Sequence, residues 1–509
     1  MDIPQDKTSK WLVGSKHKRP AEEIANVKQL VELVVSIGRE YQSPQTGFVH
    51  LFYQKLAEPS NDTIPIYENF LFALALIRLP FVKNVQEGKS LIEKLLHFQS
   101  EEGNFPLYLH EYPKCVDSYQ GARLLLPIYW LLKEYSKELG SELEGALKKS
   151  ALSLLEFVRG LDREKMPFRF SIKVAASLVA FGKLFKNSER EFEGETWLEQ
   201  LNWESKEEAF GSWCSPEGIG NTIAALSILY PKLSKSPWNH FWEHLTETWS
   251  SEFCSYVGPA VQLYQLREEP EVGLYDFYLG EISKQFSYRL YQSSPSQFEA
   301  VLVHHFDESL KDISLPHQLE GRVGGMDYLM QRNESYAYSA MRIPFVVPGE
   351  IKKGLHSFRM TFGDLMNTHT LSCQGGRISA TDFKVVEGGI DLFYWTEEEV
   401  FPEDREKSYE VNLFLNRDEA IDLQVNGRKA TTFRLGDEIS VNSANCKFTI
   451  RYEMASGEGY YMGHLMPSNR LSQKGTVGEN QFETYDTRIG LRVVRRKGPC
   501  CLVAQIRFS

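Results

Sequence analysis

The 509-residue sequence lacks most of the motifs that assign a protein to a function class directly. It has no phosphate loop, dinucleotide fingerprint, zincin helix or G-x-S-x-G elbow. It also lacks long apolar runs: the longest, Phe70–Leu79, ends at Pro80 and is shorter than the roughly 18 residues of a membrane span. The first residues have no apolar core of the kind that a secretory signal needs. We therefore expect a soluble, cytoplasmic chain without a membrane span.

Cysteine and positive charge are also scarce. The seven cysteines have irregular spacing and form no C-x-x-C pair, so neither a disulfide framework nor a zinc site is indicated, and we expect no metal and no cofactor. Asp and Glu number 68 against 57 Lys and Arg, which gives a net charge of −11 and argues against a nucleic-acid partner. One basic cluster stands out and indicates either a charge-guarded edge strand or a contact to an acidic chain: Arg488, Arg492, Arg495, Arg496 and Lys497.

A repeat is present in the first half of the sequence. The motif aromatic-x-Ser-x-x-x-x-Phe begins at Tyr41, Phe98 and Trp203, a fourth copy from Trp249 ends in Tyr256, and a degenerate copy begins at Leu161. The starts are 57, 63, 42 and 46 residues apart, which suits one helical hairpin per repeat. We interpret the Ser as part of a turn and the final aromatic as a plug against the helices.

Two kinds of helix flank the repeats. Amphipathic helices are predicted before the copies, over 21–39, 85–97, 143–158 and 237–248. Helices that are apolar on all sides are predicted after them, over 66–79, 117–132, 170–185, 218–230 and 259–266, with a last helix over 271–291. Because a helix that is apolar all round must be buried all round, this alternation predicts an outer ring around an inner ring. The expected fold is an incomplete (α/α)5-6 toroid.

From about Gln297 the apolar period changes to two, which predicts strands with one buried face. Phe358, Met360 and Phe362 alternate with polar residues, and two further segments, 447–452 and 504–508, do the same. The segment 421–435 is predicted to be a β-hairpin that Asn426-Gly427 closes. His304 and His305 are placed on a strand with opposite orientations, so they cannot easily share a metal.

These patterns divide the chain into an N-terminal extension (1–20), an α/α toroid (21–292) and a C-terminal antiparallel β-sandwich (297–509), with the junction at Ser293–Ser296. This order of domains resembles that of the heparinase II/III-like polysaccharide lyases. The resemblance implies a cleft that holds an acidic polysaccharide and a β-elimination by Asn, Tyr, His and Arg side chains. The segment Asn367–Arg377 loosely resembles the H-N-T-L…G strand of that family and implies a substrate-binding role for His369, although Thr368 precedes it and no Asn follows it.

The candidate site residues lie in the loops that lead into the inner helices. There, helix N-termini favour an anion. The richest loop contains Tyr108, His110 and Asp117 and is followed by Tyr119 and Arg123, which share a helix face. His110 is either a base or substrate contact or a structural histidine, Asp117 is either catalytic or a helix cap, and the Tyr119–Arg123 pair is either functional or a packing pair.

Four more candidates come from the later loops. Trp213 suits either sugar stacking or core packing, and Tyr256 is a candidate substrate contact. Asn221 and Arg169 would hold the substrate carboxylate, while Tyr119 or His110 would take the proton. Because the inner-helix N-termini gather at one end of a toroid, we expect His110, Tyr119, Arg169 and Asn221 to converge there.

The preferred function is therefore that of a polysaccharide lyase-like protein that binds or cleaves an acidic, uronate-containing glycan. Two alternatives stay open. A glycoside hydrolase on the same scaffold would need two facing carboxyl groups, for which Asp117 and Glu217 are the nominated pair. A non-catalytic carbohydrate-binding or scaffold protein would keep the fold without the chemistry.

Overall fold

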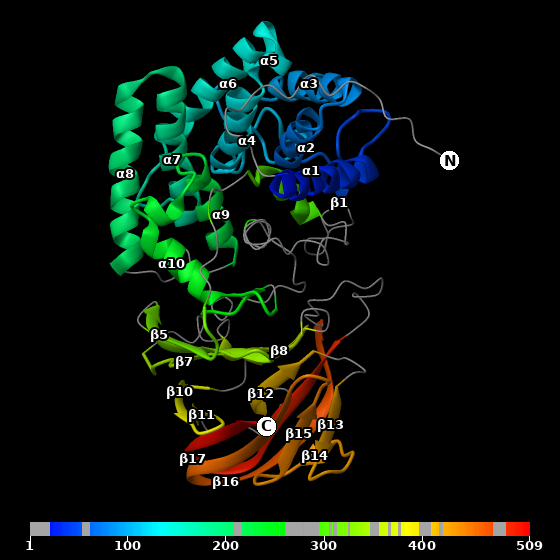
Figure 1. Cartoon of the computed structure of the whole chain (residues 1–509), viewed down its shortest axis with the longest axis vertical. Coiled ribbons are helices and arrows are strands. Elements are labelled where there is room, and N and C mark those ends of the chain that lie inside the picture. The colour runs from blue at the N-terminus through cyan, green and yellow to red at the C-terminus, as the bar shows by residue number, and fades with distance from the viewer. Residues whose placement is uncertain are drawn as a thin grey trace. The chain divides into compact units, whose positions relative to one another are not determined.

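The structure is a computed structural model of the whole chain. It describes the following residues: 21–52, 62–207, 216–253, 255–259, 278, 295–304, 308, 313–323, 326–346, 356–364, 368–374, 378–396, 409–416, 421–471 and 485–509. Helices occupy the first half of the chain and antiparallel strands the second half, so the predicted order of the two parts is confirmed (Figure 1).

The chain forms two compact units, and several segments of the sequence contribute to each. The first unit comprises Met1–Arg163, Ser177–Glu191 and Phe298–His305, and the second comprises the rest. The long helix α7 (Phe168–Phe185) and the next one, α8 (Ser188–Glu207), both begin in one unit and end in the other. The predicted domain limits at residues 20, 292 and 297 stay a prediction.

In the first unit, helices alternate between buried and amphipathic. In α2 (Ile66–Arg78) all residues are buried except Glu68 and Arg78, and α4 (Gln120–Glu134) is buried along most of its length. The amphipathic helices α1 (Ala21–Tyr41) and α3 (Val82–Leu96) pack on α2, while α6 (Ser141–Arg159) packs on α4 after the short α5 (Ser136–Leu139). The inner helices α2 and α4 also pack on each other. For these helices the predicted alternation of outer and inner faces is confirmed.

Helix α8 has no counterpart among the helices expected from the sequence. It is a 20-residue helix with seven glutamates and little apolar periodicity, so the pattern that marks amphipathic helices is weak. The third copy of the repeat begins inside it, and its first aromatic, Trp203, is 65% exposed. The helices that follow are α9 (Pro216–Ser227) and α10 (Asn239–Thr248). The predicted helices over 259–266 and 271–291 lie outside the described residues except for Pro259 and Tyr278.

The repeat motif forms a tight loop whose ends pair. In the first copy Gln42 bridges Val49, and the loop precedes the short pair β1 (Leu51–Phe52) and β2 (Asp62–Thr63). In the fourth copy β3 (Trp249–Ser250) pairs with β4 (Ser255–Tyr256). The final aromatics Phe48, Phe105 and Tyr256 are buried, as an aromatic plug would be. In the second copy Gly103 has φ +99°, and a Cβ there would lie 2.5 Å from the Ser153 carbonyl oxygen, so only glycine fits.

Most strands of the second unit belong to one hydrogen-bonded antiparallel sheet. Its main path runs β13-β15-β16-β17-β12-β9-β8-β7-β6-β5, with β10–β11 joined to β17 and β14 to β16. The first nine strands are β5 (His317–Val323), β6 (Met326–Arg332), β7 (Tyr336–Met341), β8 (His356–Gly363), β9 (Thr368–Gln374), β10 (Ala380–Val386), β11 (Gly389–Thr396), β12 (Tyr409–Leu415) and β13 (Asp422–Val425). The others are β14 (Thr432–Phe433), β15 (Glu438–Asn442), β16 (Lys447–Leu471) and β17 (Tyr485–Phe508).

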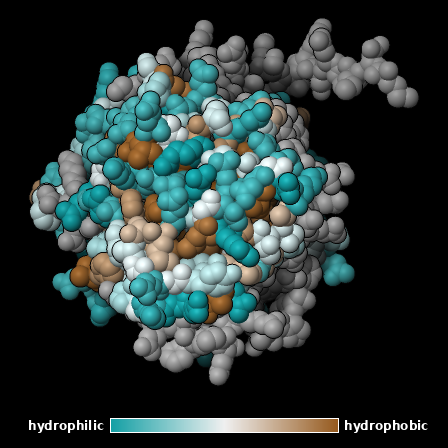
Figure 2. Space-filling view, turned by 90° about the horizontal axis from the view of Figure 1, so that it is seen from below, coloured by the Kyte–Doolittle hydropathy of each residue, from teal (hydrophilic) through white to brown (hydrophobic). Residues whose placement is uncertain are grey.

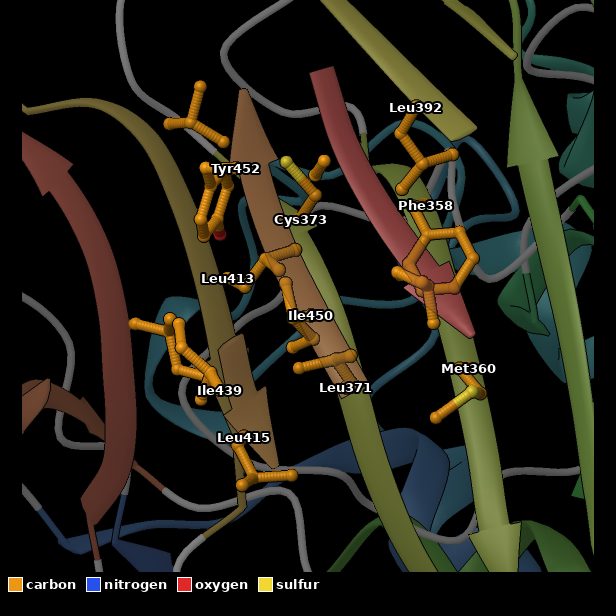
Figure 3. Close-up of a cluster of buried hydrophobic side chains, with 14 of the residues drawn as sticks. Phe358, Met360, Leu371, Cys373, Leu392, Leu413, Leu415, Ile439, Ile450 and Tyr452 are labelled. Atoms are coloured by element: carbon orange, nitrogen blue, oxygen red, sulfur yellow. The ribbon is translucent and has the colours of Figure 1, made fainter. Parts of the chain in front are cut away.

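The sheet folds over itself into two layers because β16 and β17 are long enough to belong to both. One half of β17 pairs with β12 and the other half with β11. Across the core, Phe362 of β8 packs edge-on against Phe448 of β16 at 5.2 Å, and Tyr336 of β7 stacks on Phe508 at 3.9 Å. Figure 3 shows side chains of both layers in the shared core. The predicted antiparallel sandwich is therefore confirmed.

Two local predictions need correction. The Asn426-Gly427 turn is present, with φ +49° and +72°, but its arms separate: β13 pairs with β15 and β14 with β16. The segment after Pro295 is not a strand. It forms the 3₁₀ helix η3 (Pro295–Leu302), and His304 follows it in irregular structure, while His305 lies outside the described residues.

The face seen from below is mainly hydrophilic, and its apolar residues are scattered in small groups (Figure 2). Apolar residues distributed in this way are normal for a protein surface and mark no site by themselves. In the part of the chain that the structure describes, no helix is long and apolar enough to cross a membrane.

Candidate functional site

The N-terminal ends of α2 and α4 come together in the first unit. The loop after the second repeat runs antiparallel to the segment that enters α2: Ile66 donates its N–H to the Leu107 carbonyl at 3.1 Å and Leu109 donates to Ile64 at 2.9 Å. Six side chains define what we call the α2–α4 cluster: Tyr67, Tyr108, His110, Tyr119, Arg123 and Glu299. The N-terminal ends of α2 and α4 therefore lie close together.

Tyr108 and His110 form the most open part of the cluster. Their rings are nearly parallel, at 4°, with centroids 5.7 Å apart. His110 lies on the short 3₁₀ helix η1 (Leu109–Glu111) and is exposed, and Tyr108 is half-buried. A stacked pair of this kind offers a flat apolar surface and a titratable ring nitrogen at the same place. Such a surface suits the face of a sugar ring.

Tyr67 and Glu299 form the inner part of the cluster. The Tyr67 hydroxyl donates a hydrogen bond to Glu299 Oε1 at 3.0 Å, and Tyr67 is only 5% exposed. Burial raises the pKa of the Tyr67 phenol well above its usual value, and the Glu299 carboxylate raises it further, while the nearby Arg123 guanidinium acts in the opposite direction. Tyr67 is therefore protonated at neutral pH. Arg123 and Glu299 are half-buried, so charges of both signs lie beside the phenol.

Asp117 has a structural task at the start of α4. Its Oδ1 accepts the Tyr119 N–H at 2.8 Å, and its carbonyl oxygen accepts a hydrogen bond from the buried Asn104 side chain at 3.0 Å. This is the behaviour of a helix-starting residue. Tyr119 directly precedes α4, and Arg123 lies in its first turn.

Arg169 and Asn221, the predicted carboxylate ligands, belong to the second unit. Arg169 lies in the first turn of α7 with its guanidinium 5.0 Å from the centroid of the Phe170 ring. Asn221 is in α9 and is 6% exposed. Because His110 and Tyr119 belong to the first unit, the convergence of these four residues stays a prediction. One turn after Arg169 comes Lys173, a lysine that is only 2% exposed and that the sequence analysis did not single out.

Two other predicted contacts are buried. The Tyr256 hydroxyl and His244 Nε2 are 2.8 Å apart, and Tyr256 is almost completely enclosed. His369 is 2% exposed, lies 5.3 Å from the Phe362 ring and 3.4 Å from Asn416 Nδ2, and shares the core face of β9 with Leu371. The burial and contacts show how the two residues are held, and their role in substrate binding stays a prediction. Trp213 falls within 208–215, outside the described residues.

Two arginines of the basic cluster contact other side chains of the sandwich. Arg496 is buried against Glu410, with Nε to Oε1 at 3.0 Å. Arg488 lies over the Tyr409 ring at 4.1 Å. Arg495 and Lys497 are exposed. Among the described residues, no group of three or more His, Cys, Asp or Glu side chains could hold a metal ion.

Tyr67 and Glu299 are not among the candidates that the sequence indicates. Tyr67 sits in a helix whose apolar character indicated only burial, and Glu299 was placed in the β-sandwich domain. The two residues are 232 positions apart, so no local pattern links them. Only the return of the chain to the first unit after the second set of helices brings them together.

Comparison with known proteins gives similarity in fold only. No protein-family profile and no curated protein matches the sequence. Among solved structures, heparinase III has a TM-score of 0.47 at 10% identity, over 99% of this chain and 88% of that one. A chondroitinase AC lyase has a TM-score of 0.45 at 8% identity, over 95% and 82%. A heparan sulfate lyase from Pedobacter heparinus has 0.37 at 8%, over 97% and 84%. The chemistry of this chain has to be judged from its own residues.

Proposed function

We propose that the chain binds an acidic, uronate-containing glycan at the α2–α4 cluster and cleaves it by β-elimination. The observation that carries this proposal is the open Tyr108–His110 stack, on the loop that pairs with the start of α2, in the same cluster as Arg123 in the first turn of α4. The stack supports a sugar ring, and the arginine can pair with a carboxylate by charge-assisted hydrogen bonds. The positive ends of the two helix dipoles favour the same anion.

Elimination from a uronate has two requirements that this cluster can meet. The carboxylate must be neutralised so that the adjacent C–H becomes acidic, and a base must lie within hydrogen-bond reach of that proton. In this proposal Arg123 binds the carboxylate and His110 or Tyr119 takes the proton. Tyr67, which burial and Glu299 keep protonated, cannot serve as the base. Arg169 and Asn221 remain proposed carboxylate ligands from the second unit.

The alternative of a non-catalytic glycan-binding protein rests on the same stack, since stacking and ion pairing bind a sugar without any chemistry. The glycoside hydrolase reading has less support because Asp117 is occupied by the Tyr119 N–H. The cytoplasmic location remains a prediction from the sequence.

The experiment is incubation of the protein with a panel of uronate polymers and with a neutral glucan as control. β-Elimination creates an unsaturated uronate that absorbs in the ultraviolet. New reducing ends without this absorbance would indicate hydrolysis instead. Binding measured by calorimetry without either product would indicate the binding protein, and the absence of both binding and products would contradict the proposal.

A further inference from the structure

A short segment at the junction between helices and strands carries one member of the α2–α4 cluster. We call Phe298–His304 the junction strap. Five of its seven residues are almost completely buried: Phe298, Ala300, Val301, Leu302 and Val303. The strap belongs to the first compact unit, although the residues before and after it belong to the second. The chain therefore returns to the inner helices at this point before the strands begin.

Three contacts fix the strap to α2 and α4. The Tyr67 hydroxyl donates to Glu299 at 3.0 Å. At the other end of α2, Arg78 Nη1 donates to the carbonyl oxygens of Val301 and, at 3.2 Å, of Val303. On α4, the Trp130 and His304 rings stack with centroids 3.5 Å apart at 16°. Two of these contacts do not involve Glu299, so the strap keeps its place if the Glu299 side chain is changed.

The hydrogen-bonding capacity of the Tyr67–Glu299 pair is only partly used. A phenol has one hydrogen, and Tyr67 has committed it to Glu299 Oε1, so its oxygen can only accept a further hydrogen bond. A carboxylate accepts on both oxygens, and no residue that the structure describes donates to Glu299 Oε2. The pair therefore offers acceptors to a ligand, and the positive charge of Arg123 acts on the same phenol. Sugar hydroxyl groups are donors that suit such acceptors.

We propose that Glu299 is a ligand-positioning residue of this site, which accepts a sugar hydroxyl on Oε2 and holds the Tyr67 hydroxyl on Oε1. This inference rests on the proposed glycan function and adds the junction strap to the site. Arg123 then binds the uronate carboxylate, and Glu299 fixes the rotation of the same ring by holding one of its hydroxyl groups. A ligand must accordingly present an anionic group and a hydroxyl donor close together.

The test uses the full-length chain and a tetrasaccharide from a uronate polymer that the wild-type protein binds. Glu299→Ala should weaken binding at least tenfold, because the hydroxyl loses its acceptor. Glu299→Gln should weaken it less, because an amide oxygen can still accept. Tyr67→Phe should have an intermediate effect and report on the orientation of Glu299. Glu308→Gln is the matched control, since Glu308 accepts from Ser234 at 2.9 Å and is not part of the cluster.

Two further measurements keep the outcomes distinct. Hydrogen exchange of 298–304 should be unchanged in Glu299→Gln, because the Arg78 and Trp130 contacts hold the strap, and a loosened strap in that variant would show a merely structural role. If Arg123→Ala abolishes binding and Glu299→Ala binds like the wild type, the role of Glu299 is refuted while the glycan function stands. If the wild type itself neither binds nor cleaves any uronate glycan, both proposals are refuted together.

Discussion

Glu410 and Arg496 form an ion pair inside the β-sandwich, with Nε and Oε1 3.0 Å apart and side chains 0% and 1% exposed. Tyr461 donates to the other carboxylate oxygen at 2.8 Å. Together, Glu410, Tyr461 and Arg496 thus join β12, β16 and β17. Burial raises the pKa of the Tyr461 phenol, and Glu410 raises it further, so the phenol stays a donor to the carboxylate. One arginine of the basic cluster is therefore part of the interior and unavailable to an acidic partner.

Removal of the Glu410 carboxylate should leave the charge of Arg496 buried without an ion-pair partner. We expect Glu410→Ala to lower the free energy of unfolding by about 3–5 kcal/mol, measured by urea denaturation. Arg495→Ala, a neighbouring but exposed arginine, should change it by less than about 0.5 kcal/mol. The double variant Glu410→Leu with Arg496→Met should recover much of the loss, because it buries no charge. Equal effects of Glu410→Ala and Arg495→Ala would contradict the buried pair.

The stability of the fold should depend on pH through His244. Burial lowers the pKa of His244 from 6.5 to about 4, and His240 contributes in the same direction. Between these values the unfolded chain binds a proton that the folded chain does not, so stability is complete above pH 6.5 and falls as the pH decreases. The loss at pH 5 should be about 2 kcal/mol relative to pH 7.5. We expect His244→Gln, which keeps a group able to bond Tyr256, to lack this part of the pH dependence in urea titrations. If His244→Gln loses as much stability between pH 7.5 and pH 5 as the wild type does, His244 is not the cause of the pH dependence.

Substitutions at the open stack should separate ring packing from charge. We expect Tyr108→Ala to weaken glycan binding about tenfold, an effect typical of a lost aromatic contact, and Tyr108→Phe to retain it. Arg123→Ala should weaken binding about 10–100-fold, because a hydrogen bond to a charged group contributes about 1.5–3 kcal/mol. Calorimetry with a uronate tetrasaccharide measures both. Similar losses for Phe and Ala at position 108 would speak against ring stacking.

Asn221 and Arg169 should affect the rate more than the binding if they hold the carboxylate as its charge develops. Loss of such a donor raises the barrier by roughly 3–4 kcal/mol, so we expect Asn221→Ala and Arg169→Ala to lower kcat by about 10²–10³. Unsaturated product formation at saturating substrate is the measurement. Lys149→Ala, on the exposed side of α6, is a suitable control and should keep the wild-type rate. Variants that bind and turn over normally would remove both residues from the mechanism.

The parts of the fold that sequence predicts well are those with a strong periodic signal. Helix α2 was expected over 66–79 and is observed over 66–78, because an apolar helix that ends before a proline has a clear boundary. The alternation of Phe358, Met360 and Phe362 likewise identified the core face of β8. Helix α8 was missed because seven of its 20 residues are glutamates and its apolar residues show little periodicity. The arms of the Asn426-Gly427 turn were misassigned because a turn motif specifies the reversal and not the later partners of each strand.

The candidate site was predictable only where a loop contains its chemistry locally. Tyr108, His110, Tyr119 and Arg123 lie within 16 residues, and their proximity to a helix start is visible in the sequence. Glu299 joins them through tertiary structure alone, and period-two spacing concealed its 3₁₀ helix. His369 was nominated through a family-like segment; the structure places it on β9 near Phe362, and its role at a substrate stays a prediction.

The route of the chain between its two units determines where the protein can be cut or recombined. The first unit contains residues from three separate stretches, the last of which begins at Phe298. A single protease cut near residue 293 would leave the helical fragment without the strap that covers α2 and α4, and would expose apolar surface on both helices. A gene fusion or domain exchange made at this sequence junction should therefore yield insoluble fragments, whereas a swap that carries the strap with the helices keeps the first unit complete.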